Sequence, residues 1–177
     1  GITDDNKKII GEEQITKCPN KIKKIEYDQK ITINQQVISA VNESDLIIFS
    51  SGSLLTSIAP HLINKTLVKA LKKSSAPKMY ICNLFTQPGE TDNFKVSDHI
   101  KILESYLGSK SIDVVVANNN MLDSKLVNIY QTTEQKDPVL LDEENLKKLN
   151  VKILTDDLAK IEDGVYRHDS LKTAYLI

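Results

Sequence analysis

The 177-residue sequence has no tryptophan, two cysteines and a single arginine, Arg167, among its 23 basic residues. Cys18 and Cys82 share no metal-ligand spacing and are too few for a disulfide framework, so we expect reduced thiols. Apolar runs are only a few residues long, which argues against a membrane-spanning helix. A net charge of −1 with mixed signs provides no basic surface for nucleic acid. We therefore expect a soluble cytoplasmic protein that binds neither membrane nor nucleic acid.

Several motifs of catalysis and nucleotide binding are also missing. The turn Ser50-Ser51-Gly52-Ser53 is followed by no lysine, so it is not a Walker A loop, and the sequence contains no G-x-G-x-x-G. No G-x-S-x-G motif surrounds Ser53, which argues against a serine nucleophile. The three histidines lie far apart and form no H-E-x-x-H pattern, so no metal site is expected. These patterns assign no catalytic residue.

Four short apolar runs alternate with segments of helical periodicity. The runs cover residues 46–49, 78–82, 112–117 and 151–154 and are rich in Val and Ile. Such strands, without polar alternation, are typical of parallel strands buried on both faces. We therefore predict one α/β domain over residues 1–177: a three-layer α/β/α Rossmann-like sandwich with a mainly parallel sheet. An edge strand within 21–28 and an extended piece at 138–141 are also expected.

Helices are predicted where an apolar stripe follows a capping residue. Pro60 lacks a backbone donor and should end or kink the helix that contains it, and Gly108 should be a C-cap. The expected N-caps are Asn34, Asp142 and either Ser97 or Asp98. The predicted helical segments are 34–44, 54–63, 66–73, 98–107, 122–130, 142–149 and 170–177.

The turn after the first strand is a candidate anion site. The first amides of a helix have no partner within it, and the helix dipole favours negative charge there. Gly52 would allow a close approach of the backbone, and Ser53 and Thr56 would add hydroxyl donors. The alternative is a polar turn that only caps the helix.

A second polar loop, 83–91, follows the next strand and contains Asn83, Gln87 and Glu90. Loops after parallel strands meet at the carboxyl edge of the sheet, where ligands bind. We therefore expect this loop to face the turn at residues 50–53. Glu90 is either a carboxylate that reads the ligand or an ordinary loop charge.

Two further clusters of polar residues have alternative interpretations. His99 could serve acid–base chemistry, whereas Asp98 more simply complements the helix dipole. Arg167 could bind phosphate in a bidentate manner, with His168 and Asp169 beside it. The other interpretation is an internal Arg167–Asp169 pair that anchors the C-terminal helix.

Taken together, these motifs resemble the 2-phospho-L-lactate transferase family, and more closely its bacterial gluconeogenesis-factor branch. The resemblance depends on residues 51–60, 80–91, 97–99 and 167–169, of which Gln87-Pro88-Gly89-Glu90-Thr91 with the downstream Asp98-His99 is the most specific part. The chain is similar to the second half of the family's length. It therefore lacks the family's opening glycine-rich phosphate loop and early acidic residues. It also departs from the family motif Gly-Pro-Gly-Ser-Leu-Tyr-Thr-Ser, which reads Ser-Ser-Gly-Ser-Leu-Leu-Thr-Ser at residues 50–57.

The resemblance implies two alternative functions. The gluconeogenesis-factor branch is implied to bind nucleotide sugars such as UDP-N-acetylglucosamine and to influence carbon metabolism and cell shape. The alternative is a transferase that moves a phospholactyl group from a guanosine diphosphate donor to a deazaflavin, with Mg²⁺. We favour the first, because the chain shows no carboxylate cluster for a metal clamp.

The resulting hypothesis places a nucleotide sugar or nucleotide diphosphate between the two loops. Gly52, Ser53 and Thr56 would contact phosphate, and the second loop would read the sugar or base through Asn83, Gln87 and Glu90. Supporting residues would be Asp98, His99, Arg167, His168 and Asp169. No cofactor is expected in this portion unless the transferase alternative brings Mg²⁺. An apolar sheet edge would make the chain dependent on further sequence or on a partner chain, which leaves a homo-oligomer as an open alternative.

Overall fold

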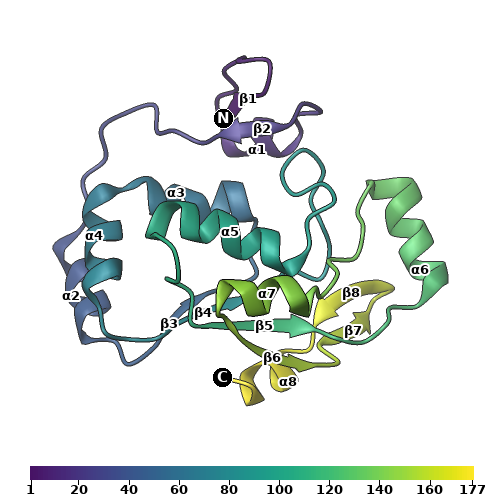
Figure 1. Ribbon diagram of the computed structural model, residues 1–177. Helices are drawn as coiled ribbons and strands as arrows, with labels where there is room; N and C mark the ends of the chain where they lie inside the picture. The colour runs from purple at the N-terminus through teal and green to yellow at the C-terminus, as the bar shows by residue number, and fades with distance from the viewer.

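The computed structural model describes residues 1–177, and its centre is a four-stranded parallel sheet in the order β3-β4-β5-β6 (Figure 1). The strands are β3 (Ile47–Phe49), β4 (Lys78–Ile81), β5 (Val114–Asn118) and β6 (Lys152–Asp156). Each coincides with one of the four apolar runs. Because the strands are parallel, the loops after β3 and β4 emerge at the same edge of the sheet.

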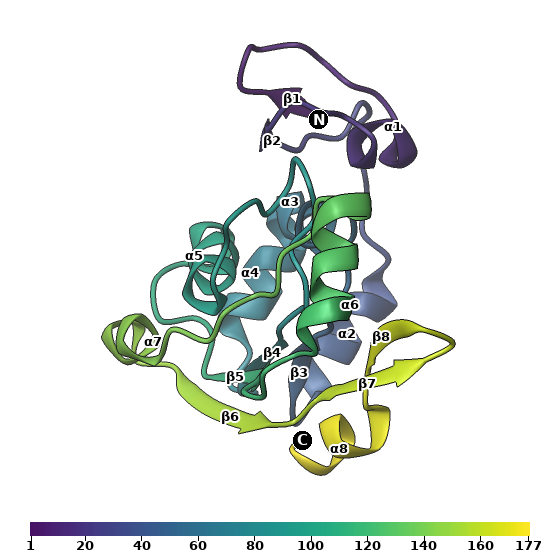
Figure 2. The same ribbon diagram turned by 90° about the vertical axis from the view of Figure 1, so that its right-hand side faces the viewer.

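Helices cover both faces of the sheet, which confirms the α/β architecture, but they cover them unequally. A core of 17 buried residues lies under one set of helices, α2 (Gln35–Glu43), α3 (Ala59–Ile63), α4 (Lys65–Lys73), α5 (Val96–Leu107) and α7 (Glu143–Leu149). Only α8 (Ser170–Tyr175) lies against the other face (Figures 1 and 2). Strand β3 is an edge strand rather than a buried one, and Ile48 is 42% exposed.

The helix predicted over residues 54–63 has two parts. It begins as a π-helical turn, η1 (Leu54–Ile58), and continues as α3, with Pro60 in its first turn. Proline is tolerated there because the first amides of a helix have no partner within it. The side chain of Asn34 caps α2, as predicted, by accepting from the amide of Gln36.

The predicted N-cap of α5 is wrong, whereas the predicted N-cap of α7 is in place. Helix α5 begins at Val96 with Lys95 as its N-cap, not Ser97 or Asp98. Asp142 is the N-cap residue of α7, as predicted, but its carboxylate makes no capping hydrogen bond to that helix. It accepts instead from the amide and hydroxyl of Ser97, at 2.9 and 2.6 Å. The carboxylate therefore ties α7 to the start of α5. At the other end of α5, Gly108 is the C-cap, as predicted.

The predicted helix 122–130 begins two residues later and extends further. It comprises α6 (Ser124–Ile129) and a π-helical turn, η2 (Tyr130–Glu134). The expected extended piece at 138–141 is present, since Pro138 and Leu140 form isolated bridges to Phe85 and Lys95. This piece brings η2 close to the loop after β4.

A small N-terminal unit packs on top of η1 and α3. It contains β1 (Ile2–Thr3), α1 (Glu12–Thr16) and β2 (Ile22–Lys24), and only β2 is within a predicted strand (Figure 2). Ile22 and Ile25 form a separate apolar cluster with Leu55 and Ala59. The N-terminal unit is thereby attached to the helix that follows the first loop.

The C-terminal part contains an antiparallel hairpin that the sequence analysis did not predict. Its strands are β7 (Ala159–Glu162) and β8 (Val165–His168). The turn residues Asp163 and Gly164 both have positive φ, at 50° and 76°, as a tight two-residue hairpin turn requires. None of the helices combines the length and the apolar character that a membrane-spanning helix needs.

Candidate functional site

The loops after β3 and β4 lie side by side at the carboxyl edge of the sheet. The Asn83 amide group donates to the backbone carbonyls of Ser51 and Gly52, at 3.2 and 3.3 Å. Its carbonyl oxygen in turn accepts from the Tyr80 hydroxyl at 3.0 Å. Asn83 therefore joins the two loops, and the predicted convergence of residues 50–53 with residues 83–91 is present.

A buried carboxylate occupies the helix start at which we expected a phosphate. Glu90 is 3% exposed and accepts hydrogen bonds from the Ser53 hydroxyl at 2.5 Å and the Leu55 amide at 3.3 Å. The hydroxyl of Thr56 lies 2.6 Å from Ser53 and 3.4 Å from Glu90. The negative charge that a helix N-terminus favours is thus supplied by the protein itself. This network favours an internal role for Ser53, Thr56 and Glu90.

The two loop glycines are positions of close packing. A Cβ atom on Gly52 would lie 3.2 Å from Cβ of Ser57, so this space is already filled by a side chain. Gly89 has φ +76°, and a Cβ there would lie 2.9 Å from the carbonyl oxygen of Cys18. Its own carbonyl accepts from the Ile22 amide at 3.0 Å. Gly89 therefore connects the second loop to the N-terminal unit.

A cleft of about 590 Å³ opens at the same edge, on the side of the hairpin. It is formed by the loop after β4, the turn η2 and strand β8, together with Ser51 from the first loop. Its lining contains aromatic, aliphatic, and polar or charged residues: Phe85, Tyr130 and Tyr166; Leu84 and Val165; and Ser51, Asn83, Thr86, Gln87, Glu134, Lys136, Arg167 and His168. Four of the site residues predicted from the sequence line this cleft: Asn83, Gln87, Arg167 and His168. Ser53, Thr56 and Glu90 are not among the lining residues.

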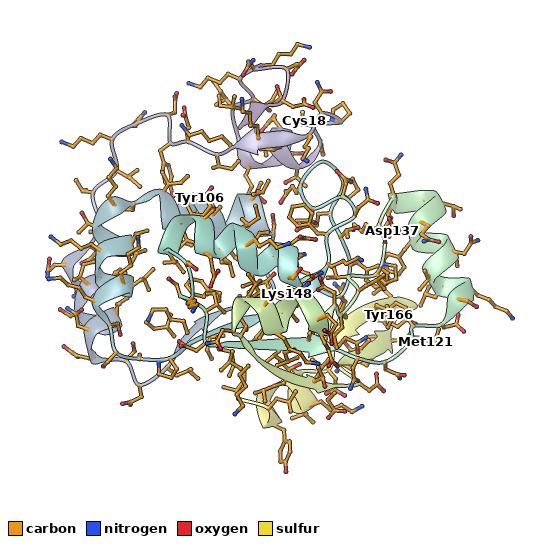
Figure 3. All side chains as sticks on the ribbon, in the orientation of Figure 1. Cys18, Tyr106, Met121, Asp137, Lys148 and Tyr166 are labelled. Carbon is orange, nitrogen blue, oxygen red and sulfur yellow. The ribbon has the colours of Figure 1, made fainter.

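Three aromatic rings pack together on one wall of this cleft. Phe85 stacks on Tyr130 with ring centroids 4.4 Å apart, and Tyr166 lies 5.6 Å from Phe85. The Tyr130 hydroxyl accepts from the Tyr166 amide at 2.9 Å, and the Tyr166 hydroxyl accepts from the Asp123 amide at 2.7 Å. Figure 3 shows Tyr166 on β8, close to the loop that carries Asp137. Such a rigid aromatic wall can stack against a planar ring.

The single arginine of the chain reaches the cleft without a carboxylate partner. No acidic side chain lies within 4 Å of the Arg167 guanidinium, so the alternative interpretation of an Arg167–Asp169 pair is not supported. Asp169 instead caps α8 through the amides of Leu171 and Lys172. Lys136 pairs with Glu134 at 2.6 Å. Arg167 is therefore the free cation of the cleft.

His168 connects the hairpin to the sheet. Burial lowers the pKa of His168. Its Nε2 lies 3.0 Å from the carbonyl oxygen of Cys82, a distance at which the ring donates. Burial also raises the pKa of the Cys82 thiol to about 12, so this cysteine is a protonated core residue and not a nucleophile. Both cysteines are free, as expected.

Asp98 and His99 have separate roles. Asp98 is an acidic residue in the first turn of α5, the position in which it complements the helix dipole, and it accepts from the Lys95 amide at 3.1 Å and from Lys101 at 2.8 Å. His99 is 1% exposed, and its Nδ1 lies 2.8 Å from the Tyr80 hydroxyl. It therefore lies behind Asn83 and does not line the cleft.

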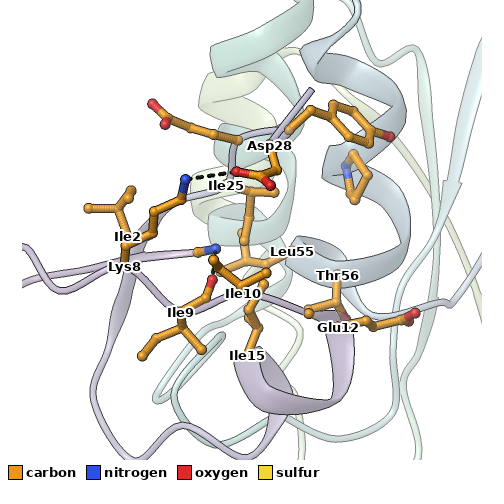
Figure 4. Close-up of a pocket in the computed structure, with 15 residues that line it drawn as sticks. Ile2, Lys8, Ile9, Ile10, Glu12, Ile15, Ile25, Asp28, Leu55 and Thr56 are labelled. Atoms are coloured by element: carbon orange, nitrogen blue, oxygen red, sulfur yellow. Dashed lines mark hydrogen bonds and ion pairs between the residues drawn. The ribbon is translucent and has the colours of Figure 1, made fainter. Parts of the chain in front are cut away.

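A second, smaller cavity of about 210 Å³ lies between the N-terminal unit and the segment formed by η1 and α3 (Figure 4). Isoleucine side chains surround much of it, including Ile9, Ile15 and Ile25, and Lys8 pairs with Asp28 at 2.9 Å near its edge. Thr56 lines this cavity and not the cleft. Thr56 and Arg167 consequently belong to different cavities.

Sequence reasoning missed the aromatic wall and Lys136. The signal for the hairpin was present as Asp163-Gly164, a dipeptide typical of tight hairpin turns. A hairpin before Asp169 would have placed Tyr166 and Arg167 on one strand at the edge of the sheet. Phe85 and Tyr130 had no comparable signal, because single aromatic residues in loops and helices are common.

The residues present do not form a divalent-cation site. No group of three or more His, Cys, Asp or Glu side chains is placed to hold a metal ion. Of the acids near the cleft, Glu90 is engaged by Ser53 and Leu55, and Glu134 by Lys136. A protein usually holds Mg²⁺ through one or two carboxylates that are free to coordinate it, together with water and substrate phosphates. The described chain alone therefore does not fit Mg²⁺.

Comparisons with known proteins agree with this architecture. The sequence model of 2-phospho-L-lactate transferase CofD matches residues 1–159. The chain is 38% identical to a Thermotoga maritima protein named "Putative gluconeogenesis factor", over 98% of this chain and 56% of that protein. It is 33% identical to the gluconeogenesis factor of Bacillus subtilis, over 98% of this chain and 55% of that protein. The chain thus spans about half the length of these two relatives.

A solved structure shows the same fold. The crystal structure of a Bacillus halodurans protein superposes with a TM-score of 0.91 at 31% identity, covering 99% of this chain and 56% of that one. A second structure of the Bacillus halodurans protein, described as a member of the UPF0052 family, gives the same values of TM-score and identity. The loops after β3 and β4, at the carboxyl edge of the sheet, both lie within the matched residues 1–159. The chain belongs to the 2-phospho-L-lactate transferase CofD family.

Proposed function

We propose that this chain is the nucleotide-sugar-binding portion of a cytoplasmic regulatory protein, a gluconeogenesis factor that acts on carbon metabolism and cell shape. The names of two relatives support the gluconeogenesis-factor part of this proposal. A UDP-sugar is the proposed ligand, and the cleft of about 590 Å³ is its proposed site. A pocket of this size lies within the range that accommodates small-molecule ligands.

The observation that carries the proposal is that Arg167 lines the same cleft as the aromatic wall. A guanidinium group without a carboxylate partner can bind a diphosphate through two parallel hydrogen bonds. The faces of Phe85 and Tyr166 provide a surface on which a pyrimidine base stacks. The Gln87 side chain lines the cleft and makes no hydrogen bond within the protein, so it is available to the base or sugar.

A transferase that uses a guanosine diphosphate donor and a deazaflavin acceptor is the second candidate. The family description favours it. Phosphoryl-type chemistry depends on a metal clamp, and the cleft residues do not form one. If the transferase reaction occurs, we expect its Mg²⁺ ligands to be supplied from outside these 177 residues.

Calorimetric titration of the full-length protein separates the two functions. We expect saturable binding of UDP-N-acetylglucosamine and no comparable heat with guanosine diphosphate. Guanosine-selective binding, or turnover of a guanosine diphosphate donor in the presence of Mg²⁺ and a deazaflavin, would overturn the regulatory proposal. Absence of heat with every UDP-sugar tested would also contradict it.

A further inference from the structure

The side chain of Asn83 is fully engaged within the protein. Its amide nitrogen donates to the carbonyl oxygens of Ser51 and Gly52, which uses both hydrogens. The orientation of the amide is therefore fixed, because the reverse orientation would bring its oxygen against two other oxygens. The Asn83 carbonyl oxygen must consequently face the Tyr80 hydroxyl, which lies 3.0 Å away.

This orientation determines where the proton of Tyr80 lies. A hydroxyl has one hydrogen, and only that hydrogen can join the oxygens of Tyr80 and Asn83. The Tyr80 oxygen therefore accepts from its other neighbour, Nδ1 of His99, at 2.8 Å. His99 must carry its proton on Nδ1, and its Nε2 is then an acceptor.

The other ring nitrogen of His99 has no partner. Nε2 is buried and makes no hydrogen bond to any group of the protein. The ring is held between Tyr80, whose centroid is 5.9 Å away in a stacked arrangement, and Phe94, which packs edge-on at 5.7 Å. A buried polar atom without a partner is unfavourable, so the stability of the core does not account for a histidine here. The hydrogen bond at Nδ1 is the one polar interaction that the ring makes.

We infer that His99 is a positioning residue of the cleft: its Nδ1–H directs the Tyr80 hydroxyl onto Asn83, and Asn83 then holds the two loops in the arrangement that seats the ligand. The part concerning the ligand rests on the proposed function. His99 itself does not touch the cleft.

Two isosteric substitutions of His99 distinguish its nitrogens. In His99→Asn the side-chain amide can donate from the position of Nδ1, whereas in His99→Gln it reaches the position of Nε2. We expect His99→Asn to bind UDP-N-acetylglucosamine with nearly the wild-type Kd. We expect His99→Gln to bind about tenfold more weakly, the equivalent of one lost hydrogen bond. Equal affinity of both variants, or a loss in both, would overturn the inference.

Tyr80→Phe serves as the second variant if His99→Gln does not fold. It keeps the ring and removes the hydroxyl, so it should weaken binding to the same extent and should add little to the effect of His99→Gln. Wild-type affinity in Tyr80→Phe would also overturn the inference.

Two readouts do not depend on a ligand. Nitrogen-15 chemical shifts of His99 should show protonation at Nδ1, and amide hydrogen exchange should be faster over residues 50–57 and 82–91 in His99→Gln than in His99→Asn. Protonation at Nε2, or equal exchange in the two variants, would refute the positioning role. If wild-type protein binds no UDP-sugar while these two results hold, the proposed function fails and the loop-locking role of His99 stands.

Discussion

Ser53 and Glu90, separated by 37 residues in the sequence, are joined by a hydrogen bond of 2.5 Å between a hydroxyl and a carboxylate oxygen. The same carboxylate accepts from the Leu55 amide, so a negative charge from the second loop lies at the start of the helix that follows the first loop. The fixed carboxylate also discourages a second anion from binding at this point, because like charges repel.

Removal of this carboxylate should destabilise the protein. In Glu90→Ala the Ser53 hydroxyl and the Leu55 amide lose their buried acceptor, and we expect the free energy of unfolding to fall by about 3 kcal/mol. Urea denaturation measures the change. Glu134→Ala is the matched control, because this carboxylate is 44% exposed in a surface pair and should contribute less than about 1 kcal/mol. A similar small loss in both variants would contradict the structural role of Glu90.

Gly89 should be intolerant of a side chain. In Gly89→Ala the new Cβ would lie 2.9 Å from the Cys18 carbonyl oxygen, at a φ of +76°. We expect a loss of roughly 2 to 3 kcal/mol and earlier proteolysis of the N-terminal unit, because both strain and a backbone clash arise.

Gly164→Ala separates these two causes. Gly164 also has φ +76°, but nothing lies within 4 Å of a Cβ built there. Its substitution should therefore cost only the conformational strain, about 1 kcal/mol. If the two alanine variants lose the same stability, the contact between Gly89 and Cys18 has no energetic importance.

The stability of the protein should depend on pH through His99. Burial lowers the pKa of His99 to about 4, below the value near 6.5 expected for unfolded chains. Between these values the unfolded chain binds the additional proton, so the contribution is fully present above pH 6.5 and is lost as the pH falls toward 4. Between pH 7 and pH 4.5 the wild-type protein should lose roughly 2.5 kcal/mol more than His99→Asn. Denaturation curves at pH 7 and pH 4.5 check this, and parallel losses would contradict it.

The Arg167 side chain should contribute affinity and not stability. It is exposed and without a carboxylate partner. We expect Arg167→Gln to weaken UDP-sugar binding by roughly tenfold to a hundredfold, as for loss of charge-assisted hydrogen bonds, with an unchanged unfolding midpoint. Lys125→Gln is the control, since Lys125 is exposed and does not line the cleft. Equal Kd values for the two variants would remove Arg167 from the proposed site.

The convergence of the two loops could be predicted because it follows from topology. Apolar runs without alternation indicated parallel strands, and parallel strands place the loops after Phe49 and Ile81 at one edge. The contact of the Glu90 carboxylate with the helix start at that edge could not be predicted. The sequence shows that a helix start has free amides and that a nearby loop contains a carboxylate. It does not show whether those amides bind an external phosphate or the side chain of Glu90.

The role of Asp142 shows the same limit. Its position before an apolar stripe correctly indicated the start of α7, because capping residues have that local signature. Its carboxylate nevertheless bonds to Ser97, which is 45 residues earlier in the sequence. Local patterns determine where a helix begins, but the packing of α7 against α5 determines which helix the side chain caps.

The parallel sheet also has a consequence for folding. Its pairings, such as Ile47 with Lys78 and Met79 with Val114, join residues roughly 30 to 40 positions apart. The entropic cost of closing each long loop must therefore be met before the strand contacts form and stabilise the fold. The β7–β8 hairpin joins neighbours such as Glu162 and Val165 and can form early. Its docking through His168 needs the finished end of β4. The aromatic wall should consequently assemble late. The change in tyrosine fluorescence intensity during refolding should then follow the slowest phase.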